Sequence, residues 1–307
     1  MSLALALVTG AALVACCGPA VLRLCFRHVA DPVAMLLGWL GLIVAVTATF
    51  VLATVMLLAP GSTRRWALHD LARICWHWAQ PSGPPAVDEI AGAAAALVLL
   101  VVLARFTATC ARRALRAHRA RRAHADLLTL AGGPSERGEA AVLWIPHPTP
   151  MAYSLGGSRG LTVLASAAGD LPANQLAAVL SHERAHLRER HHLLVAAVEG
   201  LAAAVPWLPL TRQAPAAVRL LVELRADAAA VRECGPTAVR DALLTFAGAP
   251  HPPSALSMAG DDVAIRLQRL QGRRPHRRNL LARAVLASTA LAAPLGAGVV
   301  TGILFCL

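Results

Sequence analysis

His182-Glu183-Arg184-Ala185-His186, inside the stretch AVLSHERAHLRERHHLL, is the segment on which the interpretation of the whole chain depends. On a helix, a spacing of four residues places the two imidazoles on one face, one turn apart, where they can share a metal ion. Glu183 lies about 100° around the helix from His182, so it is free to act as a general base toward a water at the metal. The motif therefore predicts a Zn²⁺ site with His182 and His186 as ligands and Glu183 as the catalytic base.

A catalytic zinc site also needs a third protein ligand and an open position, and three residues are candidates. His192 follows His186 at the spacing of HExxHxxGxxH, but Glu189 stands where that motif needs the glycine that turns the chain. Glu199 is an acid within an apolar stretch. Glu223 is favoured, because it lies on a separate predicted helix that can pack across the first.

The second helix is expected over about Ala216–Cys234 and to end at Gly235-Pro236. It is mostly Ala, Val and Leu, so we expect it to be buried on most sides. Asp227 lies one turn after Glu223 on the same face and is a candidate to accept a hydrogen bond from a ligand histidine. A solvated acidic face shared with Arg225 is the alternative.

Composition points to a membrane protein, since 57% of the 307 residues are hydrophobic and only 15% are charged. Arginines cluster after the first and third apolar stretches and before the fourth, which predicts that these flanks are cytoplasmic. The interpretation is an N-out, four-span protein of the cell membrane. The predicted spans are about 1–22, 33–59, 90–110 and 284–304.

The domain organisation follows from these spans. Residues 1–110 are predicted to hold three transmembrane helices and an outer loop, 61–85, with an interfacial helix around Trp66–Trp78. Residues 111–279 are predicted to form a cytoplasmic zinc metallopeptidase domain, and 280–307 the fourth transmembrane helix.

Within 111–279, short strands are predicted at Ala141–Ile145 and Leu161–Ala165. The motif helix is expected to start at Asp170-Leu171-Pro172, with Asp170 as a possible cap. Residues 193–210 are apolar but interrupted by Glu199 and two prolines, so we expect a core or re-entrant segment there.

At this point the sequence resembles a known family. The HERAH stretch, then Pro206-Trp207-Leu208-Pro209 and then Glu-Leu-Arg-Ala-Asp (223–227), is similar to the M56 membrane metallopeptidases, which include the protease domains of BlaR/MecR-type sensors. The M48 peptidases, HtpX-like and CAAX-protease-like, share the HExxH and ExxxD pattern. The resemblance implies a mostly α membrane protein with four transmembrane helices and a cytoplasmic α+β, gluzincin-like domain with a small β-sheet.

The resemblance also implies roles for individual residues. Zinc is held by His182, His186 and Glu223, with Glu183 as base and Asp227 supporting a ligand. A later His-Pro often stabilises the oxyanion in M48-like proteins. The candidates for that stabiliser here are His251, Arg266 and Tyr153, and for each of them an ordinary loop, surface or packing role stays open.

The expected function is an integral-membrane, zinc-dependent endopeptidase that acts in regulatory proteolysis or membrane signalling. By analogy with the family, its substrate is a transcriptional repressor or a membrane protein, bound as an added strand beside Leu161–Ala165. The sensor members carry a large extracellular domain after the last span, and the chain ends at Leu307, so direct antibiotic sensing is not expected. The alternative is a non-hydrolytic signalling or scaffold protein that keeps the zinc module, although it would not need Glu183. No direct nucleic-acid partner is expected, because the arginine-rich run 112–122 follows a span and lacks aromatic stacking residues.

Overall fold

The computed structural model is mostly helical, and its chain divides into two compact units. The first unit comprises Met1–Thr109, Leu201–Ala214 and Asn279–Leu307, and the second comprises Cys110–Gly200 and Pro215–Arg278. The structure describes residues 3–26, 31–58, 85–131, 141–146, 148–155, 161–246, 256–257, 262–271 and 280–304.

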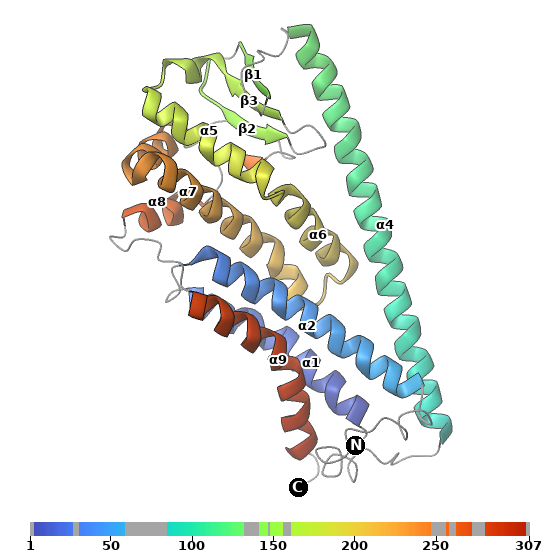
Figure 1. Cartoon of the computed structure of the whole chain (residues 1–307). Helices are drawn as coiled ribbons and strands as arrows, with labels where there is room; N and C mark the ends of the chain where they lie inside the picture. The colour runs from blue at the N-terminus through green and yellow to red at the C-terminus, as the bar shows by residue number, and fades with distance from the viewer. Residues whose placement is uncertain are drawn as a thin grey trace. The chain divides into compact units, whose positions relative to one another are not determined.

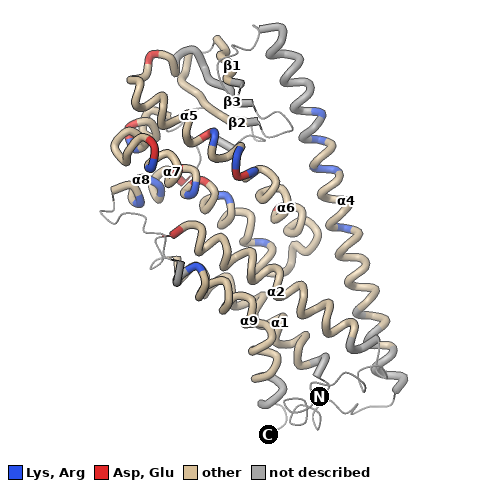
Figure 2. The backbone as a smooth tube through the Cα atoms, in the orientation of Figure 1, with Lys and Arg blue, Asp and Glu red and all other residues tan. Residues whose placement is uncertain are grey.

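Three apolar helices of the first unit pack against one another (Figure 1): α1 (Leu3–Phe26), α2 (Pro32–Leu58) and α9 (Leu280–Leu304). These helices contain few charged residues, as Figure 2 shows, and side chains such as Leu13, Val44 and Val300 are exposed on them. The segments that are long and apolar enough to cross a membrane are Ala6–Phe26, Pro32–Val55 and Arg283–Val300. These candidate spans suggest a membrane protein, since exposed apolar helices of this length are stable in lipid.

Small residues and one ion pair join these three helices. A Cβ atom added to Gly10 on α1 would lie only 2.3 Å from the backbone nitrogen of Gly298 on α9, so the two backbones touch where neither residue has a side chain. At the start of α2, Asp31 accepts a hydrogen bond of 2.9 Å from the backbone N–H of Val33. Its other oxygen accepts one of 2.6 Å from Nε of Arg283. The cap of α2 is thereby tied to the first turn of α9.

The third expected span, 90–110, lies inside a much longer helix, α4 (Pro85–Ala131). This helix does not end at Cys110 but continues through the arginine cluster, and the division between the two compact units falls within it, between Thr109 and Cys110. Leu97, Leu100 and Leu103 are exposed on it, as lipid-facing residues would be. A fourth span stays a prediction, and the helix expected around Trp66–Trp78 lies outside the described residues.

The second unit contains a four-stranded sheet in the order β1-β3-β2-β4. β1 runs parallel to β3, and β2 runs antiparallel to both β3 and β4. The bounds of β1 and β3 are those expected from the sequence. Because β3 is paired on both sides, the expectation that it adds a substrate strand is wrong: it has no free edge. The strands are β1 (Ala141–Ile145), β2 (Ala152–Leu155), β3 (Leu161–Ala165) and β4 (Leu256–Ser257).

Four helices complete this unit or join it to the first: α5 (Ala173–Arg188), α6 (His191–Ala204), α7 (Pro209–Phe246) and α8 (Val263–Gln271). Asp170 does not cap α5. It ends a short 3₁₀ helix, η2 (Ser166–Asp170), and Pro172 occupies the cap position without a side-chain hydrogen bond. At 14 residues, α6 is too short to span a membrane.

α7 begins seven residues before the predicted start, and the break predicted at Gly235 is confirmed: this residue has φ of 83°. A core of small and branched side chains holds α5, α7 and the sheet together, including Val179, Val239 and Phe246. Nearer the motif, α5 and α7 meet through Ala185, Ala226 and Ala229. Alanines allow two helix axes to approach closely, and this close approach brings the motif histidines to Glu223.

Candidate metal centre

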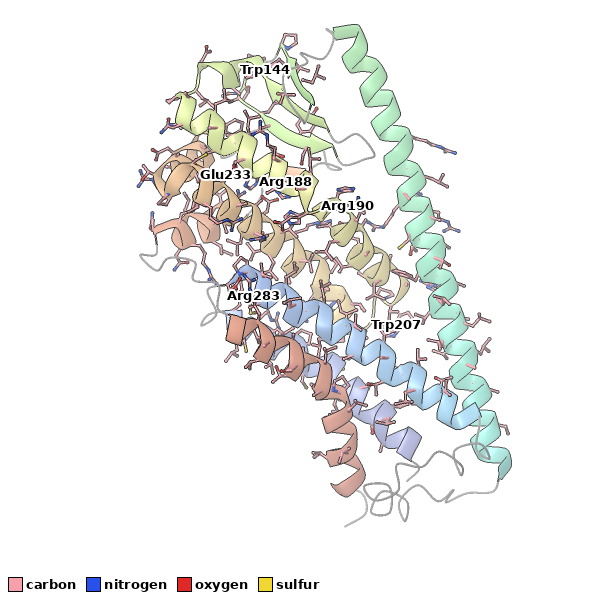
Figure 3. All side chains as sticks on the ribbon, in the orientation of Figure 1. Trp144, Arg188, Arg190, Trp207, Glu233 and Arg283 are labelled. Atoms are coloured by element: carbon pink, nitrogen blue, oxygen red, sulfur yellow. The ribbon has the colours of Figure 1, made fainter. Side chains whose placement is uncertain are left out.

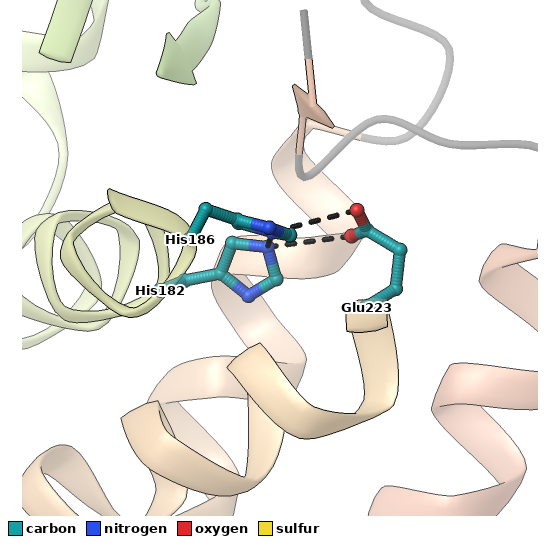
Figure 4. A group of neighbouring side chains, drawn as sticks. All are labelled: His182, His186 and Glu223. Carbon is teal, nitrogen blue, oxygen red and sulfur yellow. Dashed lines mark hydrogen bonds and ion pairs between the residues drawn. The ribbon is translucent and has the colours of Figure 1, made fainter. Parts of the chain in front are cut away.

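His182, His186 and Glu223 converge on one point between α5 and α7 (Figure 4). Nε2 of His182 lies 3.0 Å from Nε2 of His186 and 3.3 Å from Oε2 of Glu223. The other carboxylate oxygen of Glu223, Oε1, lies 3.4 Å from Nε2 of His186. Ligand atoms in a tetrahedral zinc site with bonds of about 2.0–2.1 Å are spaced about 3.3–3.4 Å apart. The donor atoms of these three residues are therefore spaced closely enough to bind a single Zn²⁺ ion.

The contact of His182 with Asp227 determines which of its nitrogens faces this point. Its Nδ1 lies 3.0 Å from Oδ1 of Asp227, and a carboxylate can only accept, so the ring proton is on Nδ1. The lone pair of Nε2 then points at Glu223 and at His186. Three lone-pair atoms this close repel one another unless a cation or a proton lies between them, so the donor set fits a bound metal cation.

The charges around the histidines favour a cation at the same place. Burial alone would lower the pKa of His182, but Asp227 and Glu223 raise it to about 9. Burial alone would raise the pKa of Glu223, but the charges of His186, Arg266 and His182 lower it to about 2. Without a bound metal, His182 therefore carries a second ring proton at neutral pH, and the same carboxylates would stabilise the positive charge of a metal ion at this place.

His186 is supported by residues that the sequence patterns do not single out. Its Nδ1 lies 3.0 Å from Nδ1 of His191, and Nε2 of His191 lies 3.3 Å from Oε2 of Glu189. Arg225 in turn binds both oxygens of Glu189, at 2.8 and 3.0 Å. The alternative of a solvated acidic face shared with Arg225 does not hold for this arginine, because it is bound to Glu189, directly after α5.

The turn between α5 and α6 places His191 against His186, a contact that no local pattern in the sequence predicts. Arg190 adopts φ of 51°, a left-handed conformation usually taken by glycine, at the junction of α5 and α6 (Figure 3). The chain therefore leaves the helix one residue after Glu189, without a glycine. A non-glycine residue in this conformation cannot be recognised from local sequence, and so the approach of His191 was missed.

Glu183 is fully buried beside the ligands, with 0% of its surface exposed. Burial raises the pKa of its carboxyl to about 7, although the charge of His182 opposes this effect. Neither carboxylate oxygen has a hydrogen bond of ordinary geometry among the described residues, while the nearby Ser154 hydroxyl on β2 lowers the pKa slightly. A carboxyl group in such surroundings can hold or release a proton near neutral pH.

Arg266 lies directly behind the ligands and is completely buried. Its Nη1 is 3.1 Å from Oε2 of Glu223, and its Nη2 donates a hydrogen bond of 2.6 Å to Oδ1 of Asp227. The alternative of a surface arginine is therefore wrong. Both contacts are to carboxylates that hold the site, and a role as stabiliser of a transition state stays a prediction.

The other candidates from the sequence are less close to the site. Tyr153 is buried on β2, and side chains alternate along a strand, so it lies on the opposite face from Ser154 and Glu183. Glu199 is bound by Arg113 and Arg219. Among the residues that the structure describes, the group able to hold a metal does not include Glu199 or His192, and His251 lies outside them.

Comparison with known proteins agrees with this geometry. The model of peptidase family M48 matches residues 114–221. The matched stretch contains His182, Glu183 and His186 and ends shortly before Glu223. It supports an M48-like metallopeptidase, a metal-dependent class of hydrolases. The comparison with curated proteins finds no match, and neither does the comparison with solved structures.

Proposed function

We propose that the protein is an integral-membrane, zinc-dependent endopeptidase that hydrolyses peptide bonds of a protein substrate. The observation that carries this proposal is the convergence of His182, His186 and Glu223, with donor atoms close enough to bind a single metal ion, next to the buried carboxyl of Glu183. A metal site with only a structural role has no use for a buried carboxylate that binds neither the metal nor a charged partner.

The roles of the residues follow from their positions. When bound, Zn²⁺ would supply Lewis-acid activation of a water and of the scissile carbonyl. Glu183 accepts the proton of the attacking water and passes it to the leaving amine. Asp227 keeps the proton of His182 on Nδ1, so that Nε2 remains a ligand atom. Arg266 holds the Glu223 and Asp227 carboxylates in place through its contacts of 3.1 and 2.6 Å.

The finer assignments belong to the same proposal. We place the chain with M56-type peptidases, on the basis of the four-span layout and the Glu223-to-Asp227 motif after HERAH. The catalytic unit faces the cytoplasm, where the arginine-rich flanks lie, in a multi-pass protein of the cell membrane. A transcriptional repressor or a membrane protein is the substrate class, and the activity serves regulatory proteolysis or membrane signalling.

The decisive experiment compares wild-type protein with Glu183→Gln, both purified in detergent and loaded with zinc. Cleavage of casein and of the protein itself should fall by about 100- to 10,000-fold in the variant, while zinc content stays at the wild-type level. Glu233→Gln, which changes an exposed glutamate of the same unit, is the matched control and should keep its activity.

Two results would contradict the proposal. Full activity in Glu183→Gln would remove the assigned base. Zinc binding by the wild type without any cleavage that chelation blocks would favour the non-hydrolytic scaffold instead. If the proposal holds, fragments present in wild-type membranes and absent from Glu183→Gln membranes identify the substrate.

A further inference from the structure

We propose that His191, held by Glu189 and Arg225, is a positioning residue that keeps Nε2 of His186 free to bind the metal. The proposal rests on the metal site described above and adds a supporting group for its second histidine. Asp227 has the equivalent position for His182, but no acidic residue touches Nδ1 of His186 among the described residues. A neutral histidine occupies that place instead.

The directions of the hydrogen bonds that His191 makes to Glu189 and to His186 follow from the contact between Arg225 and Glu189. Arg225 donates to both oxygens of the Glu189 carboxylate, at 2.8 and 3.0 Å. A carboxylate can only accept, so Nε2 of His191, 3.3 Å from Glu189 Oε2, carries the ring hydrogen. A neutral imidazole has one ring hydrogen, and Nδ1 of His191 is therefore an acceptor.

This assignment determines which ring nitrogen of the ligand His186 carries the hydrogen. With an acceptor 3.0 Å away, His186 places its hydrogen on Nδ1 and leaves the lone pair of Nε2 toward Glu223. The opposite arrangement would turn a lone pair of His191 toward the Glu189 carboxylate and block the metal-binding nitrogen of His186. Only 3% of the surface of His191 is exposed, so water does not replace it as the acceptor for Nδ1 of His186.

The backbone provides the geometry for this contact. Arg190, with φ of 51°, lies between α5 and α6, and the first residue of α6, His191, contacts His186. Arg225 lies between Glu223 and Asp227 on α7. All three charged residues of this segment thus serve the same centre. Glu223 is a ligand, Asp227 contacts His182, and Arg225 supports His186 through Glu189 and His191.

The test uses the full-length protein in detergent, stripped of metal, with two substitutions of His191. His191→Leu removes the acceptor, whereas His191→Asn places an amide oxygen near the position of the imidazole Nδ1. Zinc affinity, measured by competition with a chelator, should fall by about 10- to 100-fold in His191→Leu and return to within about threefold of wild type in His191→Asn. The visible absorption spectrum of the Co²⁺-loaded protein should change in the Leu variant and be restored in the Asn variant.

Two further variants separate positioning from general stability. Glu189→Gln alters a partly exposed residue and should lower zinc affinity by a smaller factor, about threefold to tenfold. His192→Gln changes the next histidine, which points about 100° away on α6, and should leave affinity and spectrum unchanged. Unfolding of the metal-free proteins, followed in parallel, should differ little between the Leu and Asn variants.

Each outcome is decisive. If His191→Leu keeps wild-type affinity and cobalt spectrum while His186→Ala loses metal, the metal site stands and the positioning role is wrong. If the Asn and Leu variants lose affinity equally, His191 does not act through its acceptor. If wild-type protein itself binds no stoichiometric metal, the metal site and the proposed function fail together.

Discussion

Arg266 donates two hydrogen bonds to Asp227, from Nη2 at 2.6 Å and from Nε at 2.7 Å, and both side chains are buried. Bidentate arginine–carboxylate contacts of this kind fix geometry as well as charge. The pair connects α8 to α7 directly behind the metal ligands. Arg266 on α8 therefore fixes the position of Asp227, and Asp227 in turn fixes the ring proton of His182. A helix that contributes no ligand thus affects the metal site.

Removing Arg266 should be strongly destabilising, because Asp227 and Glu223 would be left as buried carboxylates without a cation. We expect Arg266→Met to lower the free energy of unfolding by about 3–5 kcal/mol. Thermal and denaturant unfolding of metal-free protein measures this loss. Arg188→Met, which removes an exposed ion pair with Glu233, is the control and should cost less than about 1 kcal/mol. A loss as small for Arg266 as for Arg188 would show that the buried pair does not support the fold.

The identity of the third ligand can be tested by changing the two candidate glutamates. Glu223→Gln should abolish the rise in melting temperature that zinc produces, whereas Glu199→Gln should keep it, because Glu199 is bound by Arg113 and Arg219 instead. In wild type, zinc at 100 times its dissociation constant should stabilise the protein by about 2.7 kcal/mol. Differential scanning calorimetry with and without a chelator checks this. The reverse pattern would move the ligand role to Glu199.

Arg190 offers a test of the turn between α5 and α6. A β-branched side chain is strongly disfavoured at positive φ, so Arg190→Val should destabilise the protein by about 1–2 kcal/mol. Arg190→Gly should be within about 1 kcal/mol of wild type in either direction, since glycine adopts this conformation freely but gains entropy in the unfolded chain. Equal effects of Val and Gly in unfolding experiments would contradict the left-handed turn.

The packing of α1 against α9 should depend on the absence of a side chain at Gly10. We expect Gly10→Val to force the helices apart, since even a Cβ would lie 2.3 Å from Gly298. The yield of folded protein and its melting temperature in detergent should both fall. Gly296→Val on α9 is the matched control, because a Cβ at Gly296 meets nothing within 4 Å. Similar losses for both substitutions would mean that the close contact is not the cause.

Sequence alone determined the parts of this protein that depend on local patterns. The spacing of His182 and His186 predicts a shared helix face, apolar length predicts the candidate spans, and a glycine followed by a proline predicts the break at Gly235. The strands at 141–145 and 161–165 were also predictable, because short runs of alternating or branched residues between turns are strand signals. Each of these follows from the geometry of one helix or strand.

Only the tertiary structure decided how these elements serve one site. The pairing of β3 on both sides, the burial of Arg266 against Asp227 and the return of His191 to His186 each join residues from different elements or across a turn that no local rule predicts. Arg190 shows why: its backbone is left-handed, with φ of 51°, against the preference of a non-glycine residue. Local propensities set which helices form, but the contacts between them set the proton positions and charges on which a metal site depends.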